Sequence, residues 1–367
     1  MRLRAVDLHL LKLPLTVPYH LAFGDVTDFD TIVVETLDDD GRAGYGEATL
    51  LAAYGGETVE NAWAFCRALG EGLVGRTTAD AKETLAASLH DYPFCVTAFT
   101  TAIEMLEGHS ILSPAEEIRV PFLGPVDATD HDAIPGEVER LLAEGYGTLK
   151  VKVGFDVDDD LERLRVIQEA VAGRAALRLD GNQGYAAEDG CRFAAEADPE
   201  GIELFEQPCA ADDWAAAEAV AKVARVPMML DESIFGIEDI ERAADLGIAS
   251  FIKLKLLKMG GLDRLADALT LISARGMDPV LGNGVASDIG CWMEAAVAAK
   301  HIRNAGEFNG FLRPVSGILV EPLRVDSAAM VLTPDFVPEL DRDKIATFSV
   351  ATERSDTKTV AVGPAAQ

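Results

Sequence analysis

The chain has 367 residues, with 32 basic and 62 acidic side chains and a formal net charge of −30. This length exceeds that of most small single domains and accommodates a large barrel with a satellite domain. The acidic excess repels phosphate backbones and anionic lipid, so we expect neither nucleic acid nor a membrane as a partner. No apolar run is long enough to cross a bilayer.

The N-terminus and the cysteines together predict a cytoplasmic protein. The first four residues, MRLR, are not followed by the apolar core and small-residue cleavage site of a signal peptide. The cysteines are odd in number, widely spaced and free of CxxC pairs, which favours reduced core residues over a disulfide or zinc framework. They are Cys66, Cys95, Cys191, Cys209 and Cys291.

Residues 1–118 are predicted to form an α+β unit, with strands first and helices after. The stretches 5–13 and 31–36 have strand character, and the DDDGR run at 38–42 is typical of a turn. The segment 18–28, which contains Gly24, is expected to be a mobile loop. Helical periodicity then covers 57–70 and 78–109.

From residue 119 a short apolar strand alternates with a helix, which is typical of parallel βα units. The expected strands are 119–124, 148–153, 176–181, 202–206, 227–231, 250–256, 278–282 and 305–309. Eight such strands predict a closed barrel over 119–317. An open doubly wound sheet is the alternative, but the first turn, LGPV at 123–126, is not a Gly-rich phosphate loop. The strand-like pieces after residue 318 are expected to return to the N-terminal domain, giving a segment 318–367.

Four lysines are predicted to face the barrel interior. Lys150 and Lys152 share one face of the second expected strand, and Lys253 and Lys255 share one face of the sixth. A KxK pair taken alone is more often exposed, and burying four ammonium groups is unfavourable unless anions meet them.

The matching anions stand at the ends of the third, fourth and fifth expected strands, which lie between the two lysine-bearing strands. Asp180, Glu206 and Asp231 follow one another at intervals of one βα unit, so their side chains should reach similar heights. An Asp at a strand end is often only a helix cap, but three carboxylates at one level repel each other unless a cation lies between them. All-oxygen ligation favours Mg²⁺. A small carboxylate substrate would then lie between the two lysine pairs, where one lysine removes a proton and another donates one.

Six motifs resemble those of the enolase superfamily, and most closely its muconate-lactonizing-enzyme subgroup. They are KVK at 150–152, DxN at 180–182, FEQP at 205–208, LDES at 230–233, KLLKMGG at 255–261 and GYGE at 44–47. The resemblance implies a modified TIM barrel, (β/α)7β, with an α+β capping domain. It also implies abstraction of the proton α to a carboxylate, giving an enolate held by Mg²⁺.

The resemblance assigns roles residue by residue. It makes Lys152 and Lys255 the acid/base pair and Lys150 a neutralising partner of the substrate carboxylate, whereas Lys253 receives no role and is expected to pair with an acid. The metal ligands it implies are Asp180, Glu206 and Asp231. The mandelate-racemase subgroup would instead need a His–Asp pair near the sixth and seventh strands, and it lacks a lysine where Lys255 stands.

Residues for substrate recognition are also expected. Glu307 stands where dipeptide epimerases carry a DxD motif on the eighth strand, so dipeptide substrates are in doubt. Asn283 and Asp288 follow the seventh strand and are expected to contact substrate, although Asp288 is equally suited to capping the next helix. His20 and Phe23 lie in the expected loop and are predicted to close over the substrate; simple exposure is the alternative for His20.

The expected function is an isomerase, either a racemase or epimerase or a cycloisomerase, because the two-lysine arrangement is symmetric. A dehydratase acting on a substrate such as a hydroxylated amino acid is the second hypothesis. A metal-binding barrel without catalysis is the third, and the complete set of acids and lysines argues against it. We also expect a homo-oligomer.

Overall fold

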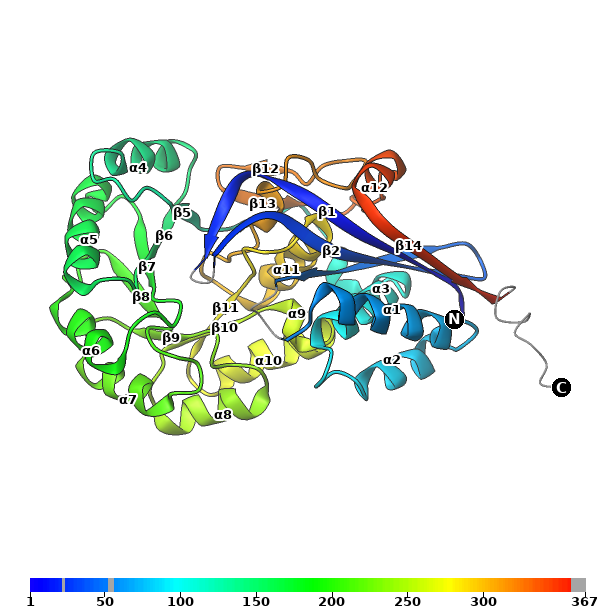
Figure 1. Cartoon of the computed structure of the whole chain (residues 1–367), viewed down its shortest axis with the longest axis horizontal. Helices are drawn as coiled ribbons and strands as arrows, with labels where there is room; N and C mark the ends of the chain where they lie inside the picture. Colours follow the sequence, from blue (N-terminus) through cyan, green and yellow to red (C-terminus); the bar gives the residue numbers. More distant parts are fainter. Residues whose placement is uncertain (22–23, 52–55, 358–367) are drawn as a thin grey trace.

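The computed structural model describes residues 1–21, 24–51 and 56–357 of the chain. It divides into a capping unit and a barrel, which lie side by side (Figure 1). All five cysteines are free, as expected. Within the described ranges no helix combines the length and apolar character needed to span a bilayer.

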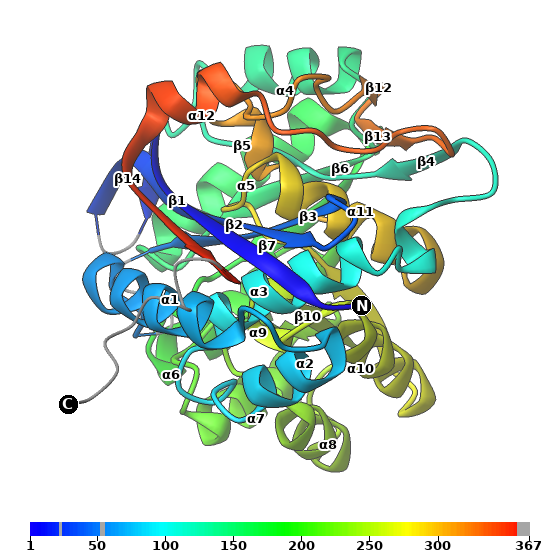
Figure 2. The same ribbon diagram turned by 90° about the vertical axis from the view of Figure 1, so that its right-hand side faces the viewer.

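The capping unit is built on a four-stranded antiparallel sheet in the order β14-β1-β2-β3. Its strands are β1 (Leu3–Leu21), β2 (Gly24–Asp38), β3 (Ala43–Leu50) and β14 (Ser349–Asp356). Three helices pack beside it, α1 (Val59–Leu73), α2 (Thr78–Ala86) and α3 (Pro93–Leu106). Figure 2 shows β14, from the end of the chain, next to β1 at the start. The C-terminal segment therefore completes the N-terminal sheet.

The segment 18–28 was expected to be a loop, and this expectation is wrong for its described part. Strands β1 and β2 continue through it as a long hairpin, in which Tyr19 pairs with Val26. An extended hairpin satisfies the backbone hydrogen bonds that a loop of this length would leave to water. The turn expected at 38–42 is confirmed, since the Asp38 carboxylate accepts from the backbone N–H groups of Asp40 and Arg42.

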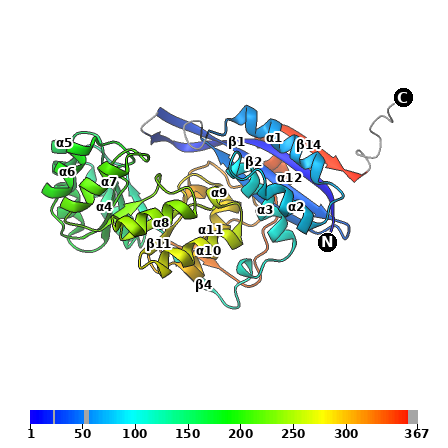
Figure 3. The ribbon, with the colours of Figure 1, turned by 90° about the horizontal axis from the view of Figure 1, so that it is seen from below.

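The barrel is a curled parallel sheet in the order β11-β10-β9-β8-β7-β6-β5. Its strands are β5 (Gly124–Val126), β6 (Thr148–Lys152), β7 (Ala176–Asp180), β8 (Ile202–Glu206), β9 (Met228–Leu230), β10 (Phe251–Leu254) and β11 (Asp278–Leu281). The helices between and after them cover its outer face (Figures 1 and 3). These are α4 (Ile134–Ala143), α5 (Val157–Val171), α6 (Ala187–Glu196), α7 (Trp214–Val223), α8 (Ile237–Leu246), α9 (Leu256–Met259), α10 (Leu262–Ala274) and α11 (Asp288–His301).

The first and last expected strands differ from the structure. Residues 119–124 do not form one strand: β4 (Ile118–Pro121) joins a separate three-stranded sheet, and the parallel sheet begins only at β5. The other members of that small sheet are β12 (Val325–Asp326) and β13 (Ala329–Leu332). The expected strand 305–309 is reduced to a short bridge. Glu307 N donates to Leu281 O at 3.0 Å and Gly306 N donates to Pro121 O at 3.0 Å, which closes the barrel.

A buried arginine also links β7 to the segment that closes the barrel. Arg178 of β7 is 0% exposed, and its guanidinium donates to Glu203 and to Ala305 O, each at 2.7 Å. The short segments left are η1 (Ser110–Leu112), η2 (Gly310–Leu312) and α12 (Arg342–Phe348).

The capping unit is joined to the barrel by buried acids that meet the first turns of barrel helices. Glu47 of β3 accepts from Ser287 N at 2.6 Å at the start of α11, and Glu104 of α3 accepts from Leu262 N at 2.8 Å at the start of α10. These N–H groups have no partner within their own helices. The acids therefore satisfy buried donors and fix the capping unit on the barrel.

Candidate active site

Strand register brings the three predicted acids to one level. Asp180 and Glu206 are the last residues of β7 and β8 and pair with each other across the sheet. Asp231 directly follows β9, whose Met229 pairs with Glu206. Because β7, β8 and β9 are neighbours between β6 and β10, the three carboxylates lie between the two strands that carry the lysines.

On the β6 side, the lysines contact the first two acids. Lys152 Nζ lies 2.6 Å from Asp180 Oδ2, and Lys150 Nζ lies 3.0 Å from the same oxygen. Lys150 also lies 3.2 Å from Glu206 Oε2 and 2.8 Å from Glu307 Oε2. Lys150 is buried, whereas the side chain of Lys152 keeps 30% exposure, so Lys152 is the more accessible of the two.

On the β10 side, the arrangement is repeated. Lys255 Nζ lies 2.8 Å from Asp231 Oδ2. Lys253 Nζ lies 3.0 Å from Glu206 Oε1 and also contacts Glu307. The expectation that Lys253 pairs with an acid is confirmed, and it pairs with more than one.

Charge pairing and burial oppose each other in this cluster. Burial raises the pKa of Asp180 and Asp231, but the lysines outweigh it and hold both pKa values below the ordinary range. For Glu307, Lys150 and Lys253 likewise overcome burial and lower the pKa to about 2. The pKa of Glu206 is raised, chiefly by burial and next by the Asp180 charge. A further cation would relieve that repulsion.

The donor chemistry of the site fits a hard divalent cation. Asp180, Glu206 and Asp231 supply only oxygen, and Asp231 Oδ1 is buried without a hydrogen bond in the described part of the chain. As the side chains stand, the carboxylate oxygens point at lysines, and no three described acidic, His or Cys side chains are grouped closely enough to hold a metal. A cation therefore requires side-chain movements.

The site forms a pocket between the two units. The capping unit contributes Thr49, Leu51 and Phe94 to its wall. The barrel contributes the lysines and acids above except Glu206, together with Asn182, Glu232, Leu257, Asn283, Gly284 and Val285. Partial enclosure by apolar side chains restricts water around the charges and strengthens their interactions.

The residues expected to recognise substrate divide into three groups. Asn283 and Glu307 line the pocket. Asp288 does not line it: it lies at the start of α11, where its carboxylate accepts from Ile318 N at 2.8 Å, and among the described residues α11 has no side-chain hydrogen bond at its N-cap. Phe23 and the side chain of His20 lie outside the described residues.

Two charged residues at the site were not predicted. Glu232 follows Asp231 directly, accepts from Asn182 Nδ2, and has a pKa raised to about 7 by burial and by the Asp231 charge. Lys258 lies 3.8 Å from Asp231 Oδ1 and donates to Ile234 O at 3.2 Å. Glu232 belongs to the LDES motif and Lys258 to the KLLKMGG motif, but the sequence prediction assigned roles only to Asp231 and Lys255 in those motifs.

Comparison with known proteins agrees with this geometry. A family model described as enolase C-terminal domain-like matches residues 133–335, which is more than half of the chain. The chain belongs to the enolase superfamily. Within it, the chain falls in the group of the mandelate racemases and muconate lactonizing enzymes.

Relatives of this superfamily member include epimerases and racemases. An L-Lys-D/L-Arg epimerase of Methylococcus capsulatus is 32% identical over 306 residues, which cover 77% of this chain and 82% of the relative. The N-succinyl Arg/Lys racemase of Bacillus cereus has the same fold, with a TM-score of 0.87 at 23% identity, covering 96% of this chain and all of that one. A dipeptide epimerase from Cytophaga hutchinsonii, solved with Mg and D-Ala-L-Val, gives a TM-score of 0.88 at 21% identity, covering 96% and 100%. The chain is thus an enzyme of this superfamily, related to isomerases.

Proposed function

We propose that this chain is a Mg²⁺-dependent racemase or epimerase that acts on a small carboxylic acid of the amino-acid-derivative class. The observation that carries the proposal is the placement of Lys152 and Lys255. Lys152 ends β6 and Lys255 directly follows β10, so the two lie on either side of the three acid-bearing strands, and each touches a different outer acid. A molecule held between them presents opposite faces of its α-carbon to the two ammonium groups.

The residues divide the work by position. Asp180, Glu206 and Asp231 would hold the cation, which supplies Lewis-acid stabilisation of negative charge on the substrate carboxylate. Lys150 adds positive charge beside that carboxylate. One of Lys152 and Lys255 takes the α-proton and the other returns a proton to the opposite face, which inverts the centre.

The test follows exchange of the α-proton in heavy water, enantiomer by enantiomer, with N-acyl amino acids, dipeptides and hydroxyprolines in the presence of Mg²⁺, and muconates are screened beside them for ring closure. Lys152→Ala should abolish exchange from one enantiomer and Lys255→Ala from the other. Loss of a positioned acid or base lowers the rate about 10²–10⁴-fold. Loss of water or ring closure in place of inversion would assign the chain to the dehydratases or cycloisomerases. Unchanged activity in both variants would refute the two-lysine mechanism.

A further inference from the structure

Each of the two lysines sits on main chain that is fixed by a buried or half-buried charged side chain from a barrel helix. Lys255 immediately precedes α9, and the first N–H of that helix, Leu256 N, has no intrahelical partner. Glu294 of α11 accepts this N–H through Oε1 at 2.9 Å. Lys152 ends β6, and its carbonyl oxygen accepts from Arg163 Nη1 of α5 at 2.7 Å.

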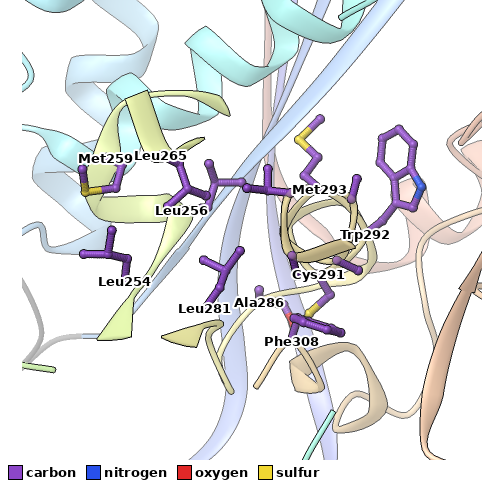
Figure 4. Packing of buried hydrophobic residues seen from close by; sticks show 14 of the residues in the cluster. Leu254, Leu256, Met259, Leu265, Leu281, Ala286, Cys291, Trp292, Met293 and Phe308 are labelled. Carbon is purple, nitrogen blue, oxygen red and sulfur yellow. The ribbon is translucent and has the colours of Figure 1, made fainter. Parts of the chain in front are cut away.

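The Glu294 contact is buried. Glu294 is 2% exposed and lines a small cavity with apolar side chains such as Met293 and Leu256, which Figure 4 labels, and with polar ones such as Glu47 and Thr101. Burial raises the pKa of Glu294 to about 8, against the opposing influence of the Leu256 N–H and the Lys255 charge. A buried carboxyl in such a setting is unfavourable unless it satisfies a donor, and Leu256 N is the donor that it meets.

The guanidinium of Arg163 contacts three carbonyl groups. Besides Lys152 O, the guanidinium donates to Ala128 O and Val126 O, each at 3.0 Å. The planar fork of an arginine suits three fixed carbonyl groups, and a lysine cannot reproduce it. Arg163 therefore ties the end of β6 to the end of β5, at the point where Lys152 leaves the strand.

We propose that Glu294 and Arg163 are positioning residues, each of which fixes the main chain beneath one of the two lysines. Neither lines the pocket between the two units. The inference rests on the proposed function, since it assigns Lys255 and Lys152 to opposite faces of the substrate. A misplacement of about 1 Å in a reacting group lowers a rate by about 10²-fold, and here the loss should fall on one face only.

The experiment uses Glu294→Met and Arg163→Met, which keep an unbranched side chain and remove the hydrogen-bonding groups. Exchange of each enantiomer's α-proton is measured in heavy water, per mole of folded enzyme. Glu294→Met should lower kcat by about 10²-fold for the enantiomer that Lys255→Ala silences, with KM and the other enantiomer little changed. Arg163→Met should show the reverse preference, so each variant is the control of the other.

Two conservative variants and one backbone variant sharpen the result. Glu294→Gln keeps an acceptor for Leu256 N and should restore most of the rate, whereas Arg163→Lys should restore little. Leu256→Pro removes the donor itself. Proline is tolerated at the first position of a helix, and Lys255 already has the extended φ of −130° and ψ of 133° that a residue before proline requires. Leu256→Pro should lower the exchange rate of the same enantiomer, and combining it with Glu294→Met should lower that rate no further.

The outcomes separate the two proposals. If Lys152→Ala and Lys255→Ala show no enantiomer preference, the proposed function fails and the positioning roles fail with it. If the lysine variants behave as expected but Glu294→Met slows both enantiomers equally or neither, the positioning role is refuted and the proposed function stands. Where Glu294→Met does not fold, Leu256→Pro decides in the same way.

Discussion

Glu47 should make the stability of the protein fall as the pH rises from about 5 to about 8. This carboxyl is 8% exposed and accepts from Ser287 N and Ser287 Oγ. Burial outweighs these hydrogen bonds and raises its pKa from 4.5 to about 7. The unfolded chain therefore releases this proton at a lower pH than the folded chain does, so folding becomes less favourable as the pH rises between those two values.

The size of the effect follows from the two pKa values. One pKa unit corresponds to about 1.4 kcal/mol, so a carboxyl that titrates at 4.5 when unfolded and at about 7 when folded lowers the free energy of unfolding by about 3 kcal/mol once the pH exceeds both. Most of this change, about 2–3 kcal/mol, falls between about pH 5 and about pH 8.

Glu47→Gln isolates this contribution. Glutamine keeps an oxygen for Ser287 N but does not titrate, so the variant should gain stability relative to the wild type as the pH rises. Urea unfolding of both proteins, at several values between about pH 5 and about pH 8, gives the difference directly. Parallel stability profiles for the two proteins would show that Glu47 ionises normally in the folded state and would refute the argument.

Three further changes have defined outcomes. Arg178→Met should lower the free energy of unfolding by about 3 kcal/mol, measured by urea unfolding, because it leaves Glu203 and a buried carbonyl without their donor; a change below about 1 kcal/mol would contradict this. Mg²⁺ at about 100 times its Kd should stabilise the protein by about 2.7 kcal/mol in a thermal-shift assay, and Asp231→Asn should abolish the shift; an equal shift in the variant would exclude Asp231 as a ligand. Gly44→Ala should destabilise the capping unit, because the new Cβ would lie 2.1 Å from Ala102 O, and a wild-type thermal midpoint would contradict this packing.

The barrel could be predicted from the sequence because its strands and helices alternate locally. The acids and lysines could be located because they stand at the ends of those strands, where register needs no long-range information. The first and last strands were less accessible. Whether residues 118–121 join the barrel sheet or pair with β13 depends on a segment some 200 residues away, and no local pattern encodes that choice.

The two proposed positioning residues, Arg163 and Glu294, were difficult to predict from the sequence for a different reason. Arg163 lies in a helix that also carries many exposed charges, and nothing in its spacing separates it from them. Glu294 carried a usable signal: it is a single acid within an apolar stretch, WMEAAVAA at 292–299. An acid in a helix buried on all sides predicts a donor to satisfy, but the identity of that donor, Leu256 N, depends on the folded structure.

The acids that cross from the capping unit to α10 and α11 make the two units dependent on each other for folding. A barrel without the capping unit would lose the acceptors of these helix-end N–H groups and uncover the apolar surface around them, and a capping unit without the barrel would lose the donors of Glu47 and Glu104. The boundary near residue 118 therefore separates the barrel from a capping unit that still lacks β14, and it is not expected to divide two independently stable modules. Recombination between relatives at this boundary should succeed only when each acid is combined with a helix whose first N–H groups are placed to bind it.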